Sequence, residues 1–309
     1  MLIASQLEPF FNEALADRLG AEVLPVPRGA PAALPAEARL LVAAPVFGVW
    51  DLPHVPNPPD QPAGWPFGLE WIQLVSSGTD HYPRWFLDTL PVSTARGVAA
   101  GPIAEFVIGA IFEAVKALHT VWIDGPEAWR TRPFAPIEGT TLGLVGYGAI
   151  GRAVARRAQG LGMRVRALRR AASAAEDGVA FARSVEELLA VSDHLVLAAP
   201  ATPQTRHILN AESLRAAKPG IHIINVARGS LIDDDALLDA LADGRVARAT
   251  LDTTTPEPLP AGHPFYSHPR VRVSPHTAAI GNGARLALVE KVAANLDRRR
   301  QGLGLLDPP

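Results

Sequence analysis

A glycine-rich loop gives the chain its clearest chemical signal. Residues 146–151 read Gly-Tyr-Gly-Ala-Ile-Gly and follow the spacing G-x-G-x-x-G. The apolar run at 142–145 predicts a strand before the loop, and the pattern at 149–160 predicts a helix after it. In this strand–loop–helix context the spacing is typical of a dinucleotide-binding loop. The alternative is a glycine-rich turn that binds nothing.

Each position of the loop has a physical reason. Gly146 would permit the tight turn, Gly148 would let the backbone approach a pyrophosphate, and Gly151 would let helix and strand pack closely. The free amides at the start of the helix, at Ala149 and Ile150, would face the phosphates together with the positive end of the helix dipole.

Two arginines occupy the position after the next predicted strand, where the residue type distinguishes NAD from NADP. The strand predicted at 164–168 is followed by Arg169 and Arg170, whereas an Asp or Glu there would bind the ribose hydroxyls of NAD. A guanidinium group pairs with a phosphate through two hydrogen bonds and stacks on adenine. We therefore expect NADP(H) to be preferred, with NAD(H) as the second choice. A solvated basic turn is the alternative, although the acidic residue is missing in either case.

A cation, a carboxylate and an imidazole occur in the second half of the chain. Arg228 follows the apolar run IHIINV, His276 follows VRV, and Glu257 lies in the segment PEPLP. A guanidinium group suits a bidentate contact with a carboxylate, and histidine is the side chain that changes charge near neutral pH. A carboxylate beside an imidazole stabilises its charged form and fixes its orientation. The alternatives are a surface arginine, a surface glutamate and a histidine that only closes a loop.

Short apolar runs alternate with helical patterns through most of the chain, which predicts an α/β fold with parallel sheets. Strands are predicted at 2–5, 40–43, 71–75, 142–145, 164–168, 194–200, 221–227, 246–253 and 271–273. Helices are predicted at 8–19, 101–119, 149–160, 233–241 and 284–300, with another after the capping box formed by Ser184 and Glu187. Gly244 is a plausible end of the fourth helix.

Two Rossmann-like domains fit this order, and the first is discontinuous. Residues 1–97 with 281–309 would form one domain, and 98–280 the other. Ligands of such folds bind at the carboxyl ends of the strands. The Pro-rich segment 51–67 is predicted to be an ordered surface loop held down by buried tryptophans.

Composition excludes several classes of function. The chain has 309 residues, 48% of them hydrophobic and 19% charged, with a formal net charge of −2 and no cysteine. No nucleic-acid or membrane partner is expected, and disulfides and cysteine metal sites are excluded. The scattered histidines predict no metal site. No secretory signal is recognised in MLIASQLEPFFNEAL, so a cytoplasmic location is expected by default.

Four motifs, GYGAIG, NVARGSLID, LDTTTPEPLP and SPHTA, occur in the order found in D-isomer-specific 2-hydroxyacid dehydrogenases. The chain resembles this family most strongly over 139–281, and the family includes glyoxylate/hydroxypyruvate reductases and phosphoglycerate dehydrogenases. The resemblance implies that a nicotinamide cofactor reduces a small 2-keto acid to a D-2-hydroxy acid. Arg228 would bind the substrate, His276 would donate the proton, and Glu257 would keep His276 charged.

The resemblance implies further roles at weaker positions. Asp252 would accept a hydrogen bond from the nicotinamide carboxamide, Pro200 would line the cofactor cleft, and Thr205 would contact the pyrophosphate region. Ala227 is also assigned to cofactor binding. The domain that contains these residues would be the dinucleotide-binding domain, and the discontinuous domain would bind the substrate.

In the first domain, the sequence Ser-Ser-Gly-Thr-Asp at 76–80 follows the predicted strand at 71–75. A turn with glycine exposes successive amides that bind anions. By resemblance, the amides of Ser77 and Gly78 would hold the substrate carboxylate, and the alternative is an ordinary turn. The sequence AAPVFGVW that ends at Trp50 departs from the polar loop of many relatives, which leaves the substrate open.

Two other functions compete with the reduction of glyoxylate or hydroxypyruvate. One is a different dehydrogenase of the family, acting on phosphoglycerate or a bulky keto acid, although the chain has no evident cluster for a phosphorylated substrate. The other is a catalytically silent NAD(P)-sensing module of the same fold. The resemblance also implies a homodimer.

Overall fold

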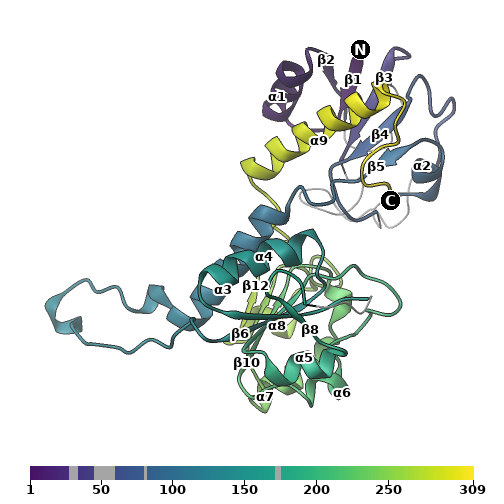
Figure 1. Cartoon of the computed structure of the whole chain (residues 1–309). Coiled ribbons are helices and arrows are strands. Elements are labelled where there is room, and N and C mark those ends of the chain that lie inside the picture. Colours follow the sequence, from purple (N-terminus) through teal and green to yellow (C-terminus); the bar gives the residue numbers. More distant parts are fainter. Residues whose placement is uncertain (28–33, 45–59, 80–81, 171–174) are drawn as a thin grey trace. The chain divides into compact units, whose positions relative to one another are not determined.

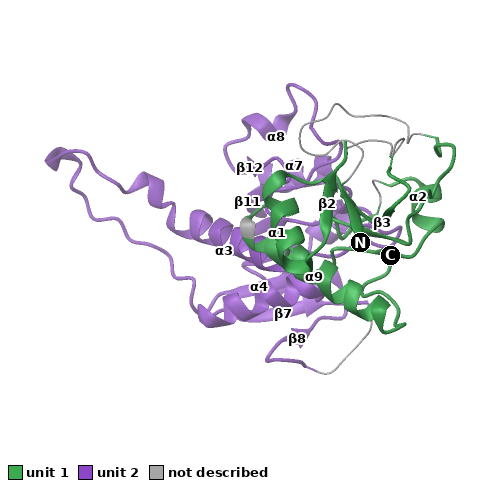
Figure 2. Ribbon diagram, turned by 90° about the horizontal axis from the view of Figure 1, so that it is seen from above, with its two compact units in different colours: residues 1–99, 280–309 green, residues 100–279 purple. Residues whose placement is uncertain are grey.

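The chain folds into two compact units, which Figure 2 shows in different colours. Unit 1 comprises Met1–Ala99 and Ile280–Pro309, and unit 2 comprises Ala100–Ala279. The structure is a computed structural model, and it describes residues 1–27, 34–44, 60–79, 82–170 and 175–309. Trp50, residues 51–59 of the Pro-rich segment and Asp80 lie outside these ranges. The functions predicted for the two domains remain predictions.

Unit 1 contains a five-stranded sheet in the order β2-β1-β3-β4-β5, in which each strand is parallel to its neighbours (Figure 1). The strands are β1 (Leu2–Ser5), β2 (Glu22–Pro25), β3 (Ala38–Ala43), β4 (Trp71–Leu74) and β5 (Val92–Ser93). The helices are α1 (Pro9–Leu19), α2 (Arg84–Asp88) and α9 (Asn282–Arg300).

Alternate residues of these strands pack on opposite faces of the sheet, as strand geometry requires. Leu40 lies in a cluster with Phe11 of α1 and Val292 of α9. Leu41 lies in the other cluster, with Trp65 and Phe86. The rings of Trp65 and Phe86 stack with their centroids 5.2 Å apart. A buried tryptophan therefore anchors the described end of the Pro-rich segment, as predicted.

Unit 2 contains a seven-stranded parallel sheet in the order β12-β11-β10-β9-β6-β7-β8. The strands are β6 (Thr141–Val145), β7 (Arg164–Leu168), β8 (Ala180–Phe181), β9 (His194–Leu197), β10 (Ile221–Asn225), β11 (Val246–Leu251) and β12 (Val271–Val273). The helices are α3 (Ala100–Lys116), α4 (Ala149–Gly160), α5 (Val185–Val191), α6 (Ala211–Leu214), α7 (Asp234–Ala242) and α8 (Pro264–Ser267), with short 3-10 turns η1 (Leu118–Thr120), η2 (Pro126–Ala128) and η3 (Gly229–Leu231). The predicted α/β class with two parallel sheets is confirmed.

The chain order reverses between β6 and β9 in this sheet. β6 is followed in sequence by β7 on one side, and the chain then crosses to β9 on the other side. Parallel sheets of this kind bind ligands at the carboxyl ends of the strands beside such a reversal. The loop that contains Gly146 leaves β6 at this point.

Helix ends follow the predicted signals in part. The Ser184 side chain accepts a hydrogen bond from the Glu187 amide at 3.2 Å, so Ser184 caps α5. The Glu187 carboxylate accepts from the Arg183 amide instead of the Ser184 amide, so only half of the predicted capping box forms. Gly244, with a φ of 84°, follows the end of α7.

An extended arm between α3 and β6 was not predicted. The helix predicted to reach residue 119 ends at Lys116, and residues 117–140 contain only η1 and η2. Both Figure 1 and Figure 2 show this arm reaching away from the rest of unit 2. Trp122 and Trp129 on the arm are 75% and 80% exposed. No helix in the described parts of the chain has the length and apolar character needed to cross a membrane.

Two histidines face each other across the centre of the unit 2 sheet. His194 on β9 and His222 on β10 are 5% and 3% exposed, and their Nδ1 atoms lie 3.3 Å apart. His222 Nε2 lies 2.9 Å from Thr250 Oγ1 on β11. One ring must supply the N–H and the other the lone pair, so the contact requires at least one neutral ring. Burial lowers the pKa of His194 to about 4, against a weaker opposing effect of Asp193.

This pair makes the stability of unit 2 sensitive to acid. In the unfolded chain, His194 is protonated below the ordinary histidine pKa of 6.5. In the folded chain it stays neutral until the pH falls to about 4. The free energy of unfolding should therefore fall as the pH is lowered from 6.5 to 4, by about 3 kcal/mol for this group. Urea titrations at several pH values would measure it. His194→Asn should weaken the pH dependence and exposed His119→Asn should not; equal slopes in all three proteins would contradict this account.

Candidate active site

The glycine-rich loop connects β6 to α4 and packs against the ends of β7 and β9. Gly146 has a φ of 104°, and its amide donates to the Leu168 carbonyl at the end of β7 at 2.8 Å. A Cβ atom on Gly146 would lie 2.8 Å from the backbone of Ala198, which follows β9. Only glycine can therefore hold the loop in this turn and against this neighbour.

The start of α4 has the features that a bound pyrophosphate needs. Gly148 is the N-cap and supplies no side-chain cap, and a Cβ atom on it would meet nothing within 4 Å. Ala149 and Ile150 begin the helix, and Gly151 lies buried in its first turn. Helix amides without a capping side chain form an anion site, so these residues fit the dinucleotide predicted from the sequence.

Arg169 follows β7 and lies beside this loop. Its guanidinium carbon is 4.4 Å from the centroid of the Phe181 ring, and its Nη1 donates to Glu176 Oε2 at 3.0 Å. Its buried Nε has no hydrogen-bond partner among the residues that the structure describes. Arg170 is exposed.

Sequence reasoning missed two residues that lie beside Arg169: Glu176 and Arg152. Arg152, in the first turn of α4, also forms an ion pair with Glu176, and its guanidinium carbon lies 4.7 Å from the Tyr147 ring centroid. The hydrogen bond from Arg152 is the main reason that the pKa of Glu176 is lowered, and Arg169 adds to the effect. Arg152 directly follows Gly151, so its place after the last glycine of the motif was an available signal.

The three predicted catalytic side chains come from loops at the carboxyl ends of neighbouring strands. Arg228 follows β10, Glu257 lies in the loop after β11, and His276 follows β12. His276 Nδ1 and Glu257 Oε2 are 2.9 Å apart, and both side chains are partly buried. The structure brings this pair together, and the charge of Arg228 acts on the same carboxylate.

Glu257 is held as a carboxylate. Burial is the largest single influence and would raise the pKa of Glu257. The hydrogen bond and charge of His276 outweigh it, together with the Thr254 amide, which donates to Glu257 Oε1 at 3.0 Å, and with the charge of Arg228. The net result is a pKa of Glu257 below its ordinary value, so the carboxylate is ionised at neutral pH.

Asn225, the last residue of β10, fixes the main chain that carries Arg228. Its buried side chain donates to the Arg228 carbonyl at 2.9 Å and accepts from the Ala227 amide at 3.0 Å. Arg228 Nη1 donates to the Ala227 carbonyl at 2.8 Å. A Cβ atom on Gly229 would lie 2.0 Å from the Thr254 carbonyl carbon. Glycine at 229 therefore lets the Arg228 loop pack directly against the loop that contains Glu257.

Asp252 accepts the hydrogen bonds that hold the loop of His276. Its Oδ1 accepts from Ser274 Oγ at 2.6 Å and from the Thr277 amide at 2.9 Å, and its Oδ2 accepts from the Ala278 amide at 3.0 Å. Its carbonyl accepts from the His276 amide at 2.9 Å. His276 itself has a φ of 52°, which these bonds hold in place. This structural duty was not foreseen, and the contact of Asp252 with the nicotinamide remains a prediction.

The loop after β9 contains the two weaker cofactor positions. Thr205 Oγ1 donates to the Pro200 carbonyl at 2.7 Å, and it accepts from the Thr202 amide at 2.8 Å. The hydroxyl therefore closes this loop, and Pro200 is exposed on it. A contact of Thr205 with the pyrophosphate region remains a prediction.

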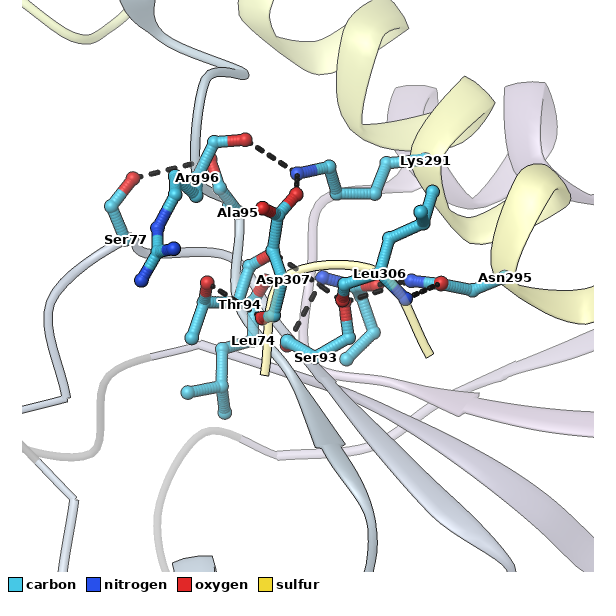
Figure 3. Close-up of polar contacts among 11 residues, drawn as sticks. Leu74, Ser77, Ser93, Thr94, Ala95, Arg96, Lys291, Asn295, Leu306 and Asp307 are labelled. Carbon is cyan, nitrogen blue, oxygen red and sulfur yellow. Dashed lines mark hydrogen bonds and ion pairs between the residues drawn. The ribbon is translucent and has the colours of Figure 1, made fainter. Parts of the chain in front are cut away.

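The turn after β4 lies in unit 1 and contains Ser76, Ser77 and Gly78. Ser76 Oγ donates to the Gly78 carbonyl at 2.7 Å. Ser77 Oγ donates to the Ala95 carbonyl at 3.1 Å, as Figure 3 shows. Among the described residues, the amides of Ser77 and Gly78 donate no hydrogen bond. The turn thus presents two amides of the kind that was predicted to hold a carboxylate.

The segment behind this turn is held by α9 and the residues after it. Figure 3 shows Lys291 and Asn295 on α9 directed toward it. Asn295 Nδ2 donates to Ser93 Oγ at 2.8 Å, and the Thr94 amide donates to the Asp307 carbonyl at 2.9 Å. Lys291 Nζ binds the Asp307 carboxylate at 2.6 Å. This partly buried network fixes β5, and Ala95, two residues after β5, bonds to the turn through Ser77.

Comparisons with known proteins agree with this arrangement. The family model described as D-isomer specific 2-hydroxyacid dehydrogenase, NAD binding domain, matches residues 108–278. Glyoxylate reductase of Thermococcus kodakarensis is 41% identical over 180 residues, which are 57% of this chain and 54% of that protein. Glycerate dehydrogenase of Methylorubrum extorquens is 31% identical over 242 residues, which are 74% of this chain and 75% of that protein.

Solved structures extend the similarity to both units. A D-isomer specific 2-hydroxyacid dehydrogenase of Xanthobacter autotrophicus Py2, solved in complex with NADPH and MES, has a TM-score of 0.77 and 26% identity. That comparison covers 100% of this chain and 97% of the other. Two Rossmann-like units and a glycine-rich loop define the class as a nucleotide-binding oxidoreductase fold. The chain belongs to the D-isomer-specific 2-hydroxyacid dehydrogenase family, as the motifs predicted, although it spans about half the length of the first glyoxylate reductases that it matches.

The role of Asp252 in holding the His276 loop can be tested by one substitution. Asp252→Asn would set an NH2 group against the Ala278 or Thr277 amide, so we expect the free energy of unfolding to fall by about 2 kcal/mol. Amide hydrogen exchange at Thr277 and Ala278 should accelerate. Asp239→Asn, on the exposed side of α7, is the matched control. Unchanged exchange at both amides would contradict the assignment.

Proposed function

We propose that this protein reduces small 2-keto acids to D-2-hydroxy acids with a nicotinamide cofactor. The observation that carries the proposal is the 2.9 Å bond between His276 Nδ1 and Glu257 Oε2, with the charge of Arg228 acting on the same carboxylate. When bound, the cofactor supplies the hydride that the carbonyl carbon accepts. Membership of the family and similarity to glyoxylate reductases and a glycerate dehydrogenase support the same reaction class.

Each of the three side chains has one task in this proposal. Arg228 binds the substrate carboxylate through two hydrogen bonds and polarises the carbonyl group. His276 gives a proton from Nε2 to the carbonyl oxygen while Nδ1 stays bonded to Glu257, and it takes the proton back in the oxidation direction. Glu257 stabilises the charged imidazole before transfer and keeps the ring in one orientation.

We assign the binding steps to separate parts of the chain. Unit 2 binds the dinucleotide at the loop 146–151, with Ala227, Pro200 and Thr205 along the cofactor and Asp252 at the nicotinamide carboxamide. Unit 1 binds the substrate carboxylate with the amides of Ser77 and Gly78, which make no other hydrogen bond among the described residues. NADP(H) is preferred because Arg169 and Arg170 stand where an acidic residue would select NAD(H).

Glyoxylate and hydroxypyruvate are the substrates that we propose first. The comparison of turnover over a small panel of 2-keto acids, including a phosphorylated one and bulky ones, tests this ranking. A protein that alters NADPH fluorescence but oxidises NADPH with none of the panel would be a nucleotide-sensing module instead.

We also propose that the protein forms a homodimer through unit 2. The support is the arm between α3 and β6, on which Trp122 and Trp129 are 75% and 80% exposed. Large aromatic side chains on a projecting segment are costly in water and are typical of protein interfaces. The location proposed for the protein is the cytoplasm.

The proton-donor role of His276 leads to a sharp kinetic expectation. His276→Asn should lower kcat for glyoxylate reduction by roughly 10³-fold, because general acid catalysis is lost, and should leave NADPH affinity nearly unchanged. Asn tolerates the positive φ at 276, so the loop should be kept. His207→Asn is the matched control, since His207 also has a positive φ of 48°. Retention of wild-type kcat in His276→Asn would refute the role.

The cofactor preference has its own test. Arg169→Asp should lower kcat/KM with NADPH by about 10²-fold and raise it with NADH, because the new carboxylate repels a 2′-phosphate and accepts from ribose hydroxyls. Arg156→Asp makes the same charge change on the exposed face of α4 and should leave the NADPH/NADH ratio as it was. The arginine argument fails if the two variants show the same ratio.

A further inference from the structure

One carboxylate lies between the two arginines beside the glycine-rich loop. Glu176 Oε2 accepts from Arg169 Nη1 at 3.0 Å, and Glu176 Oε1 contacts Arg152 Nη1. Arg169 follows β7, the strand paired with β6, and Arg152 lies in the first turn of α4, so one cation comes from the helix after the loop and the other from the neighbouring strand end. The cluster therefore forms an anion site whose anion belongs to the chain itself.

Aromatic rings hold both cations independently of Glu176. The guanidinium carbon of Arg169 lies 4.4 Å from the Phe181 ring centroid, and that of Arg152 lies 4.7 Å from the Tyr147 ring centroid. The two rings meet edge to face with centroids 5.4 Å apart. The site is thus built to keep two guanidinium groups together whichever anion lies between them.

The backbone of Glu176 is fixed by hydrogen bonds that do not involve its carboxylate. Its amide and carbonyl exchange hydrogen bonds with Val179 at 3.2 and 2.8 Å. A carboxylate that is displaced from the arginines therefore stays close to them. A second anion would either lose part of its attraction to the arginines or be repelled by the neighbouring carboxylate.

We infer that Glu176 is an internal competitor for the 2′-phosphate of NADP(H), and that it sets how strongly the chain prefers this cofactor. The inference rests on the proposed cofactor site at the loop 146–151. It adds Glu176 as a specificity-determining residue that weakens binding of the phosphorylated nucleotide. Glu176 lies between Arg152 and Arg169, which strengthen that binding. Nucleotides without the 2′-phosphate do not compete with Glu176.

Equilibrium binding of two small nucleotides tests this without catalysis. Adenosine 2′,5′-bisphosphate and adenosine 5′-monophosphate are titrated by calorimetry into the wild type, Glu176→Gln and Glu187→Gln. Glu187 is the matched control because it pairs with Arg166 of β7 at 2.7 Å with similar exposure. We expect Glu176→Gln to bind the bisphosphate about tenfold more tightly and the monophosphate about equally, with no change in Glu187→Gln.

The outcomes separate the two ideas. Unchanged bisphosphate affinity in Glu176→Gln, in a wild type that prefers the bisphosphate, would overturn the role of Glu176 and leave the proposed function intact. An equal gain for both nucleotides would also overturn it, since the effect would not depend on the 2′-phosphate. If the wild type and Glu176→Gln bound neither nucleotide, the proposed cofactor site and this inference would both be overturned.

Discussion

The hydrogen bond between His276 and Glu257 is the contact on which the candidate site depends. It forms because β10, β11 and β12 are adjacent and parallel, so the loops after them leave the sheet at the same edge. Two of these loops are held by side chains at strand ends: Asn225 at the end of β10 holds the loop of Arg228, and Asp252 just after β11 holds the loop of His276. The charged groups are few, and the two side chains that hold their backbones, Asn225 and Asp252, are buried.

The same physical device occurs twice in unit 2, with different consequences. In each place a carboxylate pairs with nitrogen groups of other residues: Glu257 with the imidazole of His276, and Glu176 with two arginines. Glu257 is partly buried and also bonded to the Thr254 amide, so it is confined to one geometry. Glu176 lies at the surface on a short turn, where an ion pair is weak and exchangeable. A carboxylate confined to one geometry, such as Glu257, can orient its partner. A carboxylate in an exchangeable ion pair, such as Glu176, can be displaced by a ligand.

The sequence predicted the parts whose signals are local. The strand and helix around the glycine loop were placed within a residue, because apolar periodicity and glycine spacing are read over short windows. Strands β2, β5 and β8 were missed, since they have two to four residues and β2 is largely exposed. The pairing of His194 with His222 depends on strand register, and the link from Glu176 to Arg152 depends on tertiary packing. Neither leaves a pattern in the sequence.

The division of unit 1 between the two ends of the chain has a consequence for its synthesis. Gln73 Oε1 accepts a hydrogen bond from Asn295 Nδ2 across 222 residues, and Val292 of α9 covers the same sheet face as Leu40. A ribosome finishes every strand of unit 2 before it makes α9. During that interval α1 can cover its part of this apolar face, and the part that α9 covers has no partner yet. A chaperone that binds exposed apolar surface would therefore bind nascent unit 1 most readily before α9 is made.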